Sequence, residues 1–235
     1  MAVTTEFGGA DQFDELAEQK SPFWTFFHLI RRKPLGAAGG IIVLIMLVVA
    51  LLADFIAPYD PVINAYDRIH MAPNLENWLG TDQFGRDILS RLIYGARTAL
   101  FVGFACSFVG AFTGLVLGVA SAYFGGTFDL LFQRVMDVFL AFPLIIMALA
   151  IVSIFGPGLE NVIIAITIPF IPQCARVVRS NALAIREIPY VDAARALGFG
   201  HARIILRHMV PNVMAPFLIM LSTFVGPALL LAASL

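Results

Sequence analysis

Long apolar runs alternate with polar segments along most of the chain. The runs cover residues 35–57, 98–124, 130–155, 161–178 and 213–235. Each is close to the ~20 residues that a helix needs to cross the hydrocarbon core of a bilayer. We therefore predict an all-α integral membrane protein with one transmembrane helix in each run.

Two segments of different character precede the first predicted span. Residues 1–20 are polar and acidic, which predicts a disordered tail and is unlike the basic start of a secretory signal. Residues 21–34 begin with Ser21 and Pro22, which together signal a helix start. Aromatic residues and a basic end at residues 31–33 then favour a helix lying in the membrane interface. A plain extension of the first span is the alternative.

Small residues and charges mark the second and third predicted spans. Gly110, Gly114 and Gly118 recur every fourth residue, which places them on one helix face and favours close packing against another helix. A glycine-lined path is the alternative. Arg134 and Asp137 are neighbours on a helix and predict a structural ion pair, because charges within spans are usually paired. A proton relay is the sharper alternative.

The remaining polar and kinked segments complete the predicted layout. Residues 58–97 carry prolines and charges of both signs, so we expect them to stay outside the bilayer. Pro169 and Pro172 predict a kink in the fourth span, which either lines a path or serves packing. Residues 179–212 form a polar, basic loop before the fifth span.

Composition narrows the class of protein. The chain is 60% hydrophobic and 13% charged, whereas a soluble domain is about half apolar and about a quarter charged. Its net charge of −1 gives no reason to expect nucleic acid as a partner. Cys106 and Cys174 lie in apolar runs and are expected to be buried rather than to form a disulfide or bind metal. Lys20 and Lys33 do not follow a glycine, so the chain has no P-loop for ATP.

Two other classes of membrane protein fit the sequence poorly. A secondary transporter or ion channel working alone would need functional charges near the middle of its spans, where they are sparse. A membrane-embedded enzyme would need a cluster of reactive side chains within the spans, but all four histidines lie outside the apolar centres. The bias of Lys and Arg toward one set of loops predicts a cytoplasmic amino terminus. The loop at 179–212 is then cytoplasmic as well.

A short helix is predicted inside this loop. Pro189 suits a first helical turn and Gly198 suits a helix end. Asp192 lies near the positive end of the helix dipole, and several alanines keep the helix narrow. A helix of about two turns is not stable alone in water. It must pack against its own spans or in the groove of a partner.

This stretch resembles the cytoplasmic EAA loop of ABC importer permeases. That motif reads Glu-Ala-Ala, three residues, Gly, nine residues, then Ile-x-Leu-Pro. Asp192 stands for Glu, Ala193 and Ala194 match, and so do Gly198 and Pro211. The sequence departs from the motif at two positions, where the pattern has Ile and Leu and this chain has His208 and Val210.

Further blocks resemble the C-type permeases of dipeptide, oligopeptide and nickel ABC importers. They are "LGTDQFGRDILSRLIYGARTAL", "SAYFGGTFD", "RVMDVFLAFP", "FGPG" and "RHMVPN". The resemblance covers residues 22–235 and implies a type I ABC importer transmembrane fold. That family has six spans and this chain shows five, so we expect a carboxy-terminal truncation.

The resemblance implies a non-catalytic permease subunit of the bacterial inner membrane. Its implied partners are a second permease, two ABC ATPases that hold ATP and Mg²⁺, an extracytoplasmic solute-binding protein and membrane lipid; this chain itself binds no cofactor. Peptides are the expected cargo, with nickel, glycosides or another small solute as alternatives. The implied ATPase contact consists of Tyr190, Val191, Asp192, Ala193, Ala194, Arg195, Ala196, Leu197 and Gly198.

Overall fold

The computed structural model describes residues 34–235, which divide into two units. The described part of the first unit is residues 34–56, and the second unit is residues 57–235. The predicted tail and, apart from Pro34, the predicted interfacial helix lie outside the described residues.

The first unit holds one apolar helix, α3 (Pro34–Leu51), followed by the short α4 (Ala53–Ile56). Within α3 only Ala50 is buried, although nearly every side chain is apolar. A helix that is apolar on all sides is typical of a membrane span, because lipid then takes the place of a protein core. This helix covers most of the first predicted span.

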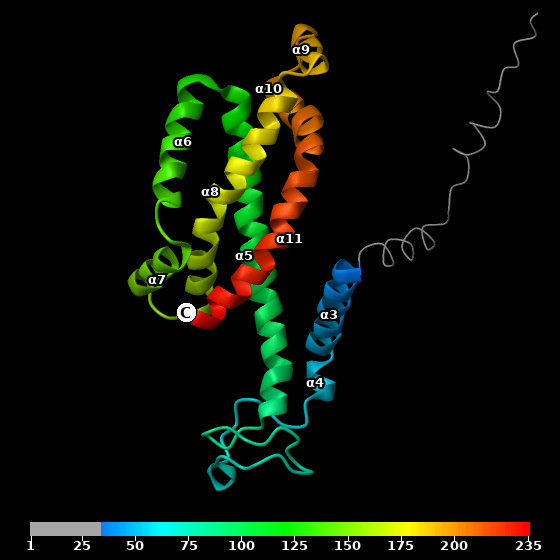
Figure 1. The fold of residues 1–235 in the computed structure, drawn as a ribbon, viewed down its shortest axis with the longest axis vertical. Coiled ribbons are helices and arrows are strands. Elements are labelled where there is room, and N and C mark those ends of the chain that lie inside the picture. Colours follow the sequence, from blue (N-terminus) through cyan, green and yellow to red (C-terminus); the bar gives the residue numbers. More distant parts are fainter. Residues whose placement is uncertain (1–33) are drawn as a thin grey trace, which may run out of the picture. The chain divides into compact units, whose positions relative to one another are not determined.

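Three long helices form the core of the second unit: α5 (Ile88–Phe124), α8 (Leu159–Arg186) and α11 (Val210–Ser234) (Figure 1). Helix α5 begins at Ile88 rather than at residue 98 because the Asp87 carboxylate caps it, accepting the Ser90 backbone N–H at 2.8 Å. Its 37 residues correspond to a length of about 55 Å. It runs from the 57–87 segment to the opposite end of the unit, where α9 lies (Figure 1).

The third predicted span is bent rather than straight. It consists of α6 (Gly126–Leu140) and α7 (Leu144–Phe155), whose axes differ by 87°. Pro143 lies at the break, where it lacks a backbone N–H and disfavours a helical conformation at Phe142. Counting this bent pair as one span gives up to five membrane-spanning segments among residues 34–235.

Helices α5 and α8 meet along the face that carries the three glycines. A Cβ atom added at Gly114 would lie 2.6 Å from the Cβ of Cys174. One added at Gly118 would lie 2.6 Å from the carbonyl oxygen of Ala175, and one at Gly110 would meet the Cβ of Phe170 at 2.9 Å. The glycines thus border a close helix contact, and α8 fills the space that a glycine-lined path would need.

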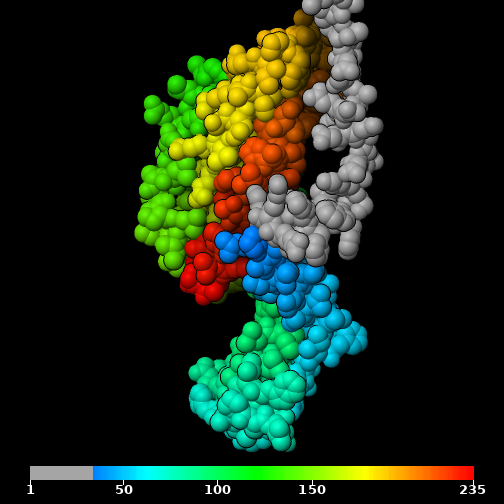
Figure 2. Space-filling view, turned by 45° about the vertical axis from the view of Figure 1, so that its right-hand side comes forward, coloured from blue at the N-terminus to red at the C-terminus, as the bar shows by residue number. Residues whose placement is uncertain are grey.

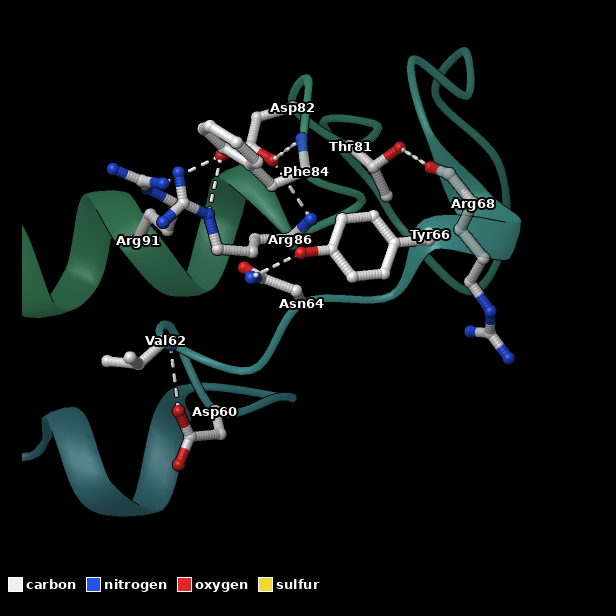
Figure 3. A network of polar contacts seen from close by, with 10 residues as sticks. All are labelled: Asp60, Val62, Asn64, Tyr66, Arg68, Thr81, Asp82, Phe84, Arg86 and Arg91. Carbon is white, nitrogen blue, oxygen red and sulfur yellow. Dashed lines mark hydrogen bonds and ion pairs between the residues drawn. The ribbon is translucent and has the colours of Figure 1, made fainter.

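The 57–87 segment folds around the carboxylate of Asp82 (Figure 3). Its oxygens accept the backbone N–H groups of Phe84 and Arg86, the Arg86 side chain at 2.9 Å and the Arg91 guanidinium at 2.6 Å. Burial works to raise the pKa of Asp82, but these hydrogen bonds and the charge of Arg86 lower it to about 2. The segment contains a single helical turn, η1 (Tyr66–Arg68), and backbone and side-chain hydrogen bonds together hold its irregular remainder.

Candidate functional site

The loop between α8 and α11 contains the helix predicted from sequence. Helix α9 (Pro189–Ala196) is followed by α10 (His201–Ile204) and by the π-helical turn η2 (Ile205–Met209), which leads into α11. We call residues 187–209 the α9 loop. It lies at one end of the second unit (Figures 1 and 2).

Helix α9 has defined ends. Pro189 occupies its first turn, where the missing N–H costs no hydrogen bond. At the other end Gly198 has φ +76°, its N–H donates to the Arg195 carbonyl at 2.9 Å, and the Phe199 N–H donates to the Ala194 carbonyl at 3.2 Å. This pair of bonds is a Schellman motif, which favours glycine in the left-handed position. An added Cβ at Gly198 would meet nothing within 4 Å, so glycine is needed for its backbone conformation and not for space.

One face of α9 packs against the helical core of the second unit, and the other face is exposed in this chain. Val191 is fully buried and Ala194 is 4% exposed, both within the core that includes Ile204 and Met209. The outer face is small and apolar with one ion pair; its exposed residues are Asp192, Ala193, Arg195, Ala196 and Leu197.

Tyr190 fastens the start of α9 to the start of α11. Its hydroxyl donates to the His208 carbonyl at 3.2 Å and accepts from the Asn212 side-chain amide at 3.0 Å. The same amide donates to the His208 carbonyl at 2.6 Å. Asn212 has no role in the sequence prediction, and the structure gives it one as a clamp on the α9 loop.

The loop also contacts the last turn of α5. The Tyr123 hydroxyl is 2.7 Å from Nδ1 of His201, and the Arg195 guanidinium lies 5.5 Å from the centre of the Tyr123 ring. Arg195 additionally pairs with Asp192 at 3.0 Å, one turn away on α9. Pattern analysis missed Tyr123, because 78 residues separate it from His201.

The ion pairs of the third span differ from the prediction. Asp137 pairs with Arg176 of α8 and not with Arg134, which is exposed. Asp129, near the start of α6, forms a second pair with Arg179 of α8. Residues three apart on a helix are only candidates for pairing, and the arginines of the packed neighbour reach the carboxylates instead.

The described residues contain no cluster suited to a metal ion. Among residues 34–235, no three His, Cys, Asp or Glu side chains come together in an arrangement that could bind one. Cys106 and Cys174 are buried, and the Cys174 thiol donates to the Ala111 carbonyl of α5 at 3.3 Å. Both cysteines therefore take part in helix packing.

Comparison with known proteins identifies the family. Residues 110–235, which include α5 from its first packing glycine onward and the entire α9 loop, match the family model described as the binding-protein-dependent transport system inner membrane component. Residues 21–73 match the N-terminal transmembrane domain of oligopeptide transport permease C. The chain belongs to the permeases of binding-protein-dependent ABC importers. It therefore has the type I ABC importer membrane fold.

Relatives of the permease share most of its length. A protein of Brucella suis biovar 1 (strain 1330), provisionally named peptide transport system permease protein, is 39% identical over 231 residues, covering 98% of this chain and 78% of the relative. The glutathione transport system permease protein GsiD of Pectobacterium atrosepticum is 36% identical over 217 residues, covering 92% of this chain and 72% of the relative. GsiD of Escherichia coli O6:K15:H31 is 37% identical over 217 residues, which again cover 92% of this chain and 72% of the relative.

Family membership settles the general role. The permease is a multi-pass membrane component of an ABC transport system and is not its enzyme, because ATP hydrolysis belongs to a separate subunit. The α9 loop lies within the matched region. A stand-alone secondary transporter and a membrane-embedded enzyme are both excluded.

Proposed function

We propose that the permease imports peptides and that α9 is the contact through which ATPase subunits drive it. The proposal names the outer face of α9 as the docking surface. It places the α9 loop and the amino terminus in the cytoplasm and the 57–87 segment outside, where the solute-binding protein docks.

The geometry of α9 is the observation that carries the proposal. A helix of eight residues is not stable alone in water, but here Val191 and Ala194 anchor it while the opposite face stays exposed. That face bears alanines and Leu197, which is 74% exposed. A narrow apolar ridge of this kind fits the groove of a partner in helix-in-groove docking.

Fixed helix ends suit α9 to transmit force. The transport path is expected to switch between two conformations, which we call the gate. Changing the ratio of their populations from 1:99 to 99:1 requires a ligand or partner to bind one conformation about 5.5 kcal/mol more tightly than the other. A flexible loop would lose part of this free energy as conformational entropy when it became ordered. The Schellman end at Gly198 and the Tyr190 clamp keep α9 ordered before docking, so more of the binding free energy can act on the gate.

The assembly is completed by proteins outside this chain. We propose one related second permease, two ATPases that hold ATP and Mg²⁺, and one binding protein. Two faces are available for them at opposite ends of the second unit (Figure 1). At one end lies the α9 loop and at the other the 57–87 segment, which exposes apolar residues outside the predicted spans, among them Leu75 and Trp78.

Peptides are the solute class that the comparisons favour. The relatives carry the names of peptide and glutathione transport permeases, and glutathione is itself a small peptide. These names favour peptides over nickel or glycosides. A direct test compares ATP-dependent uptake of radiolabelled glutathione, trialanine and nickel ions into vesicles that contain the complete importer. Saturable uptake of nickel without uptake of either peptide would contradict the assignment.

The docking role is tested by filling the outer face of α9. The substitution Ala193→Trp adds a large ring to an exposed position and leaves the buried anchors intact. We expect at least a tenfold loss of ATPase subunits that co-purify with a tagged permease.

The matched control is Ala38→Trp, an exposed alanine of the apolar helix α3 where a large apolar ring is tolerated in lipid. It should leave co-purification unchanged. Undiminished ATPase recovery with Ala193→Trp would refute docking at this face.

A further inference from the structure

The last turn of α5 is where several helices meet. Arg186, at the end of α8, donates to the Ala122 carbonyl at 2.8 Å. Ser121 donates to the Asp129 carboxylate of α6, which also binds Arg179 of α8. We call residues 121–123 the α5 end. Polar side chains thus link the α5 end to α6 and α8, independently of the α9 loop.

Within the α5 end, Tyr123 provides the contact with the α9 loop. Its side chain is 7% exposed and belongs to the same core as Val191 and Ala194. The Arg195 guanidinium lies 5.5 Å from its ring centre, within the range of a cation–π interaction. Its hydroxyl is hydrogen-bonded to His201, whose ring also packs edge-on against the Tyr123 ring at 5.6 Å between centroids. One side chain thus contacts the loop on both sides of Gly198.

Helix α5 is suited to carry a displacement away from this point. It is continuous for 37 residues from Ile88 to Phe124, and its first residue directly follows the 57–87 segment. Along the way it is packed against α8 at the glycine face, where added methyl groups would collide with backbone or Cβ atoms. Such tightly packed helices shift together as a body rather than deform, because packed interiors transmit strain.

From these contacts we infer that Tyr123 is a positioning residue that passes movement of the α9 loop to α5. It acts through its hydrogen bond to His201 and its contact with Arg195. The covalent route from α9 leads into α8 and α11, whereas Tyr123 adds a route into the helix that reaches the opposite end of the unit. This inference rests on the proposed docking of an ATPase at α9.

The experiment uses the complete importer reconstituted in lipid, with Tyr123→Phe, His201→Ala and the double variant. The readout is a ratio of two rates of ATP hydrolysis, one measured with the native solute-binding protein present and one measured without it. This ratio measures communication between the two ends of the permease. We expect Tyr123→Phe to lower it about fivefold, the factor that corresponds to one net hydrogen bond.

The double variant separates a shared contact from a general loss of stability. If Tyr123 and His201 act through one hydrogen bond, the double variant should lower the ratio no further than either single change. His201→Gln keeps a side chain able to form a hydrogen bond and should restore most of the ratio. The inference would be overturned if the double variant lowered the ratio by the product of the two single effects. It would also be overturned if Tyr123→Phe left the ratio unchanged.

ATPase recovery distinguishes this inference from the docking proposal. Tyr123→Phe leaves the outer face of α9 unaltered, so the ATPase should still co-purify in full. If Ala193→Trp also retained the ATPase, the docking proposal would fail on its own test. If ATPase recovery fell together with the ratio in Tyr123→Phe, the residue would serve assembly and the positioning role would be rejected.

Discussion

Replacing Gly198 with alanine should loosen the end of α9 without removing any contact. Gly198 has φ +76°, and an added Cβ would meet no atom within 4 Å. The cost is therefore conformational, because placing a residue with a Cβ in the left-handed region destabilises that conformation by roughly 1–2 kcal/mol. About 1 kcal/mol corresponds to a roughly fivefold shift in the population of the ordered helix end.

Gly200 supplies a matched control two residues away. Its φ of −64° and ψ of 153° are ordinary for alanine, and an added Cβ there also meets nothing within 4 Å. Hydrogen–deuterium exchange of the assembled importer, resolved to the peptide containing Phe199, measures the opening of the Schellman motif. The Phe199 amide, bonded to the Ala194 carbonyl, should exchange about fivefold faster in Gly198→Ala.

The exchange rate of the Phe199 amide should differ between the two variants. Gly200→Ala should change the exchange of Phe199 little, because it alters neither the left-handed residue nor its hydrogen bonds. Equal acceleration in both variants would show that any added methyl group disturbs the loop. Unchanged exchange in Gly198→Ala would refute the claim that the left-handed glycine fixes the end of α9.

Two further predictions concern other parts of the permease. Gly114→Ala should destabilise the helix contact by about 1–3 kcal/mol, because its Cβ would lie 2.6 Å from that of Cys174. The midpoint of thermal unfolding in detergent should therefore fall. The control Gly226→Ala, where an added Cβ meets nothing within 4 Å, should not lower this midpoint. The pKa of Asp82 is lowered from 3.8 to about 2, so its contribution to stability is complete above about pH 4 and is lost as the pH falls toward 2. Because the chain also contains Trp24, fluorescence of Trp78 is read in a Trp24→Phe background, where it should follow this loss. An unchanged acid transition after Asp82→Asn in the same background would argue against Asp82 as its source.

Local sequence patterns account for much of the architecture. Runs of apolar residues indicated the spans, because the free energy of placing a side chain in lipid depends mainly on that side chain. Proline and glycine indicated a helix between Pro189 and Gly198, and the structure has α9 at Pro189–Ala196. Both signals act within a few residues of the chain and can be read without a fold.

Helix ends and bends were less accessible to pattern analysis. Helix α5 starts within a segment that is polar enough to have been assigned to a loop, because Asp87 caps it there. The break at Pro143 divides an apolar run that hydropathy alone reads as continuous. Hydropathy reports the cost of entering lipid and not the path of the backbone.

Local patterns in the sequence were sufficient to predict a multi-span membrane protein with a short, capped helix in a polar loop. The pairing of side chains distant in sequence emerged from the three-dimensional packing: Asp137 with Arg176, Asp129 with Arg179 and Tyr123 with His201, separated by 39, 50 and 78 residues. A carboxylate or a hydroxyl bonds with whichever group packing brings within about 3 Å. That choice depends on how α5, α6 and α8 lie against one another, which no local pattern contains.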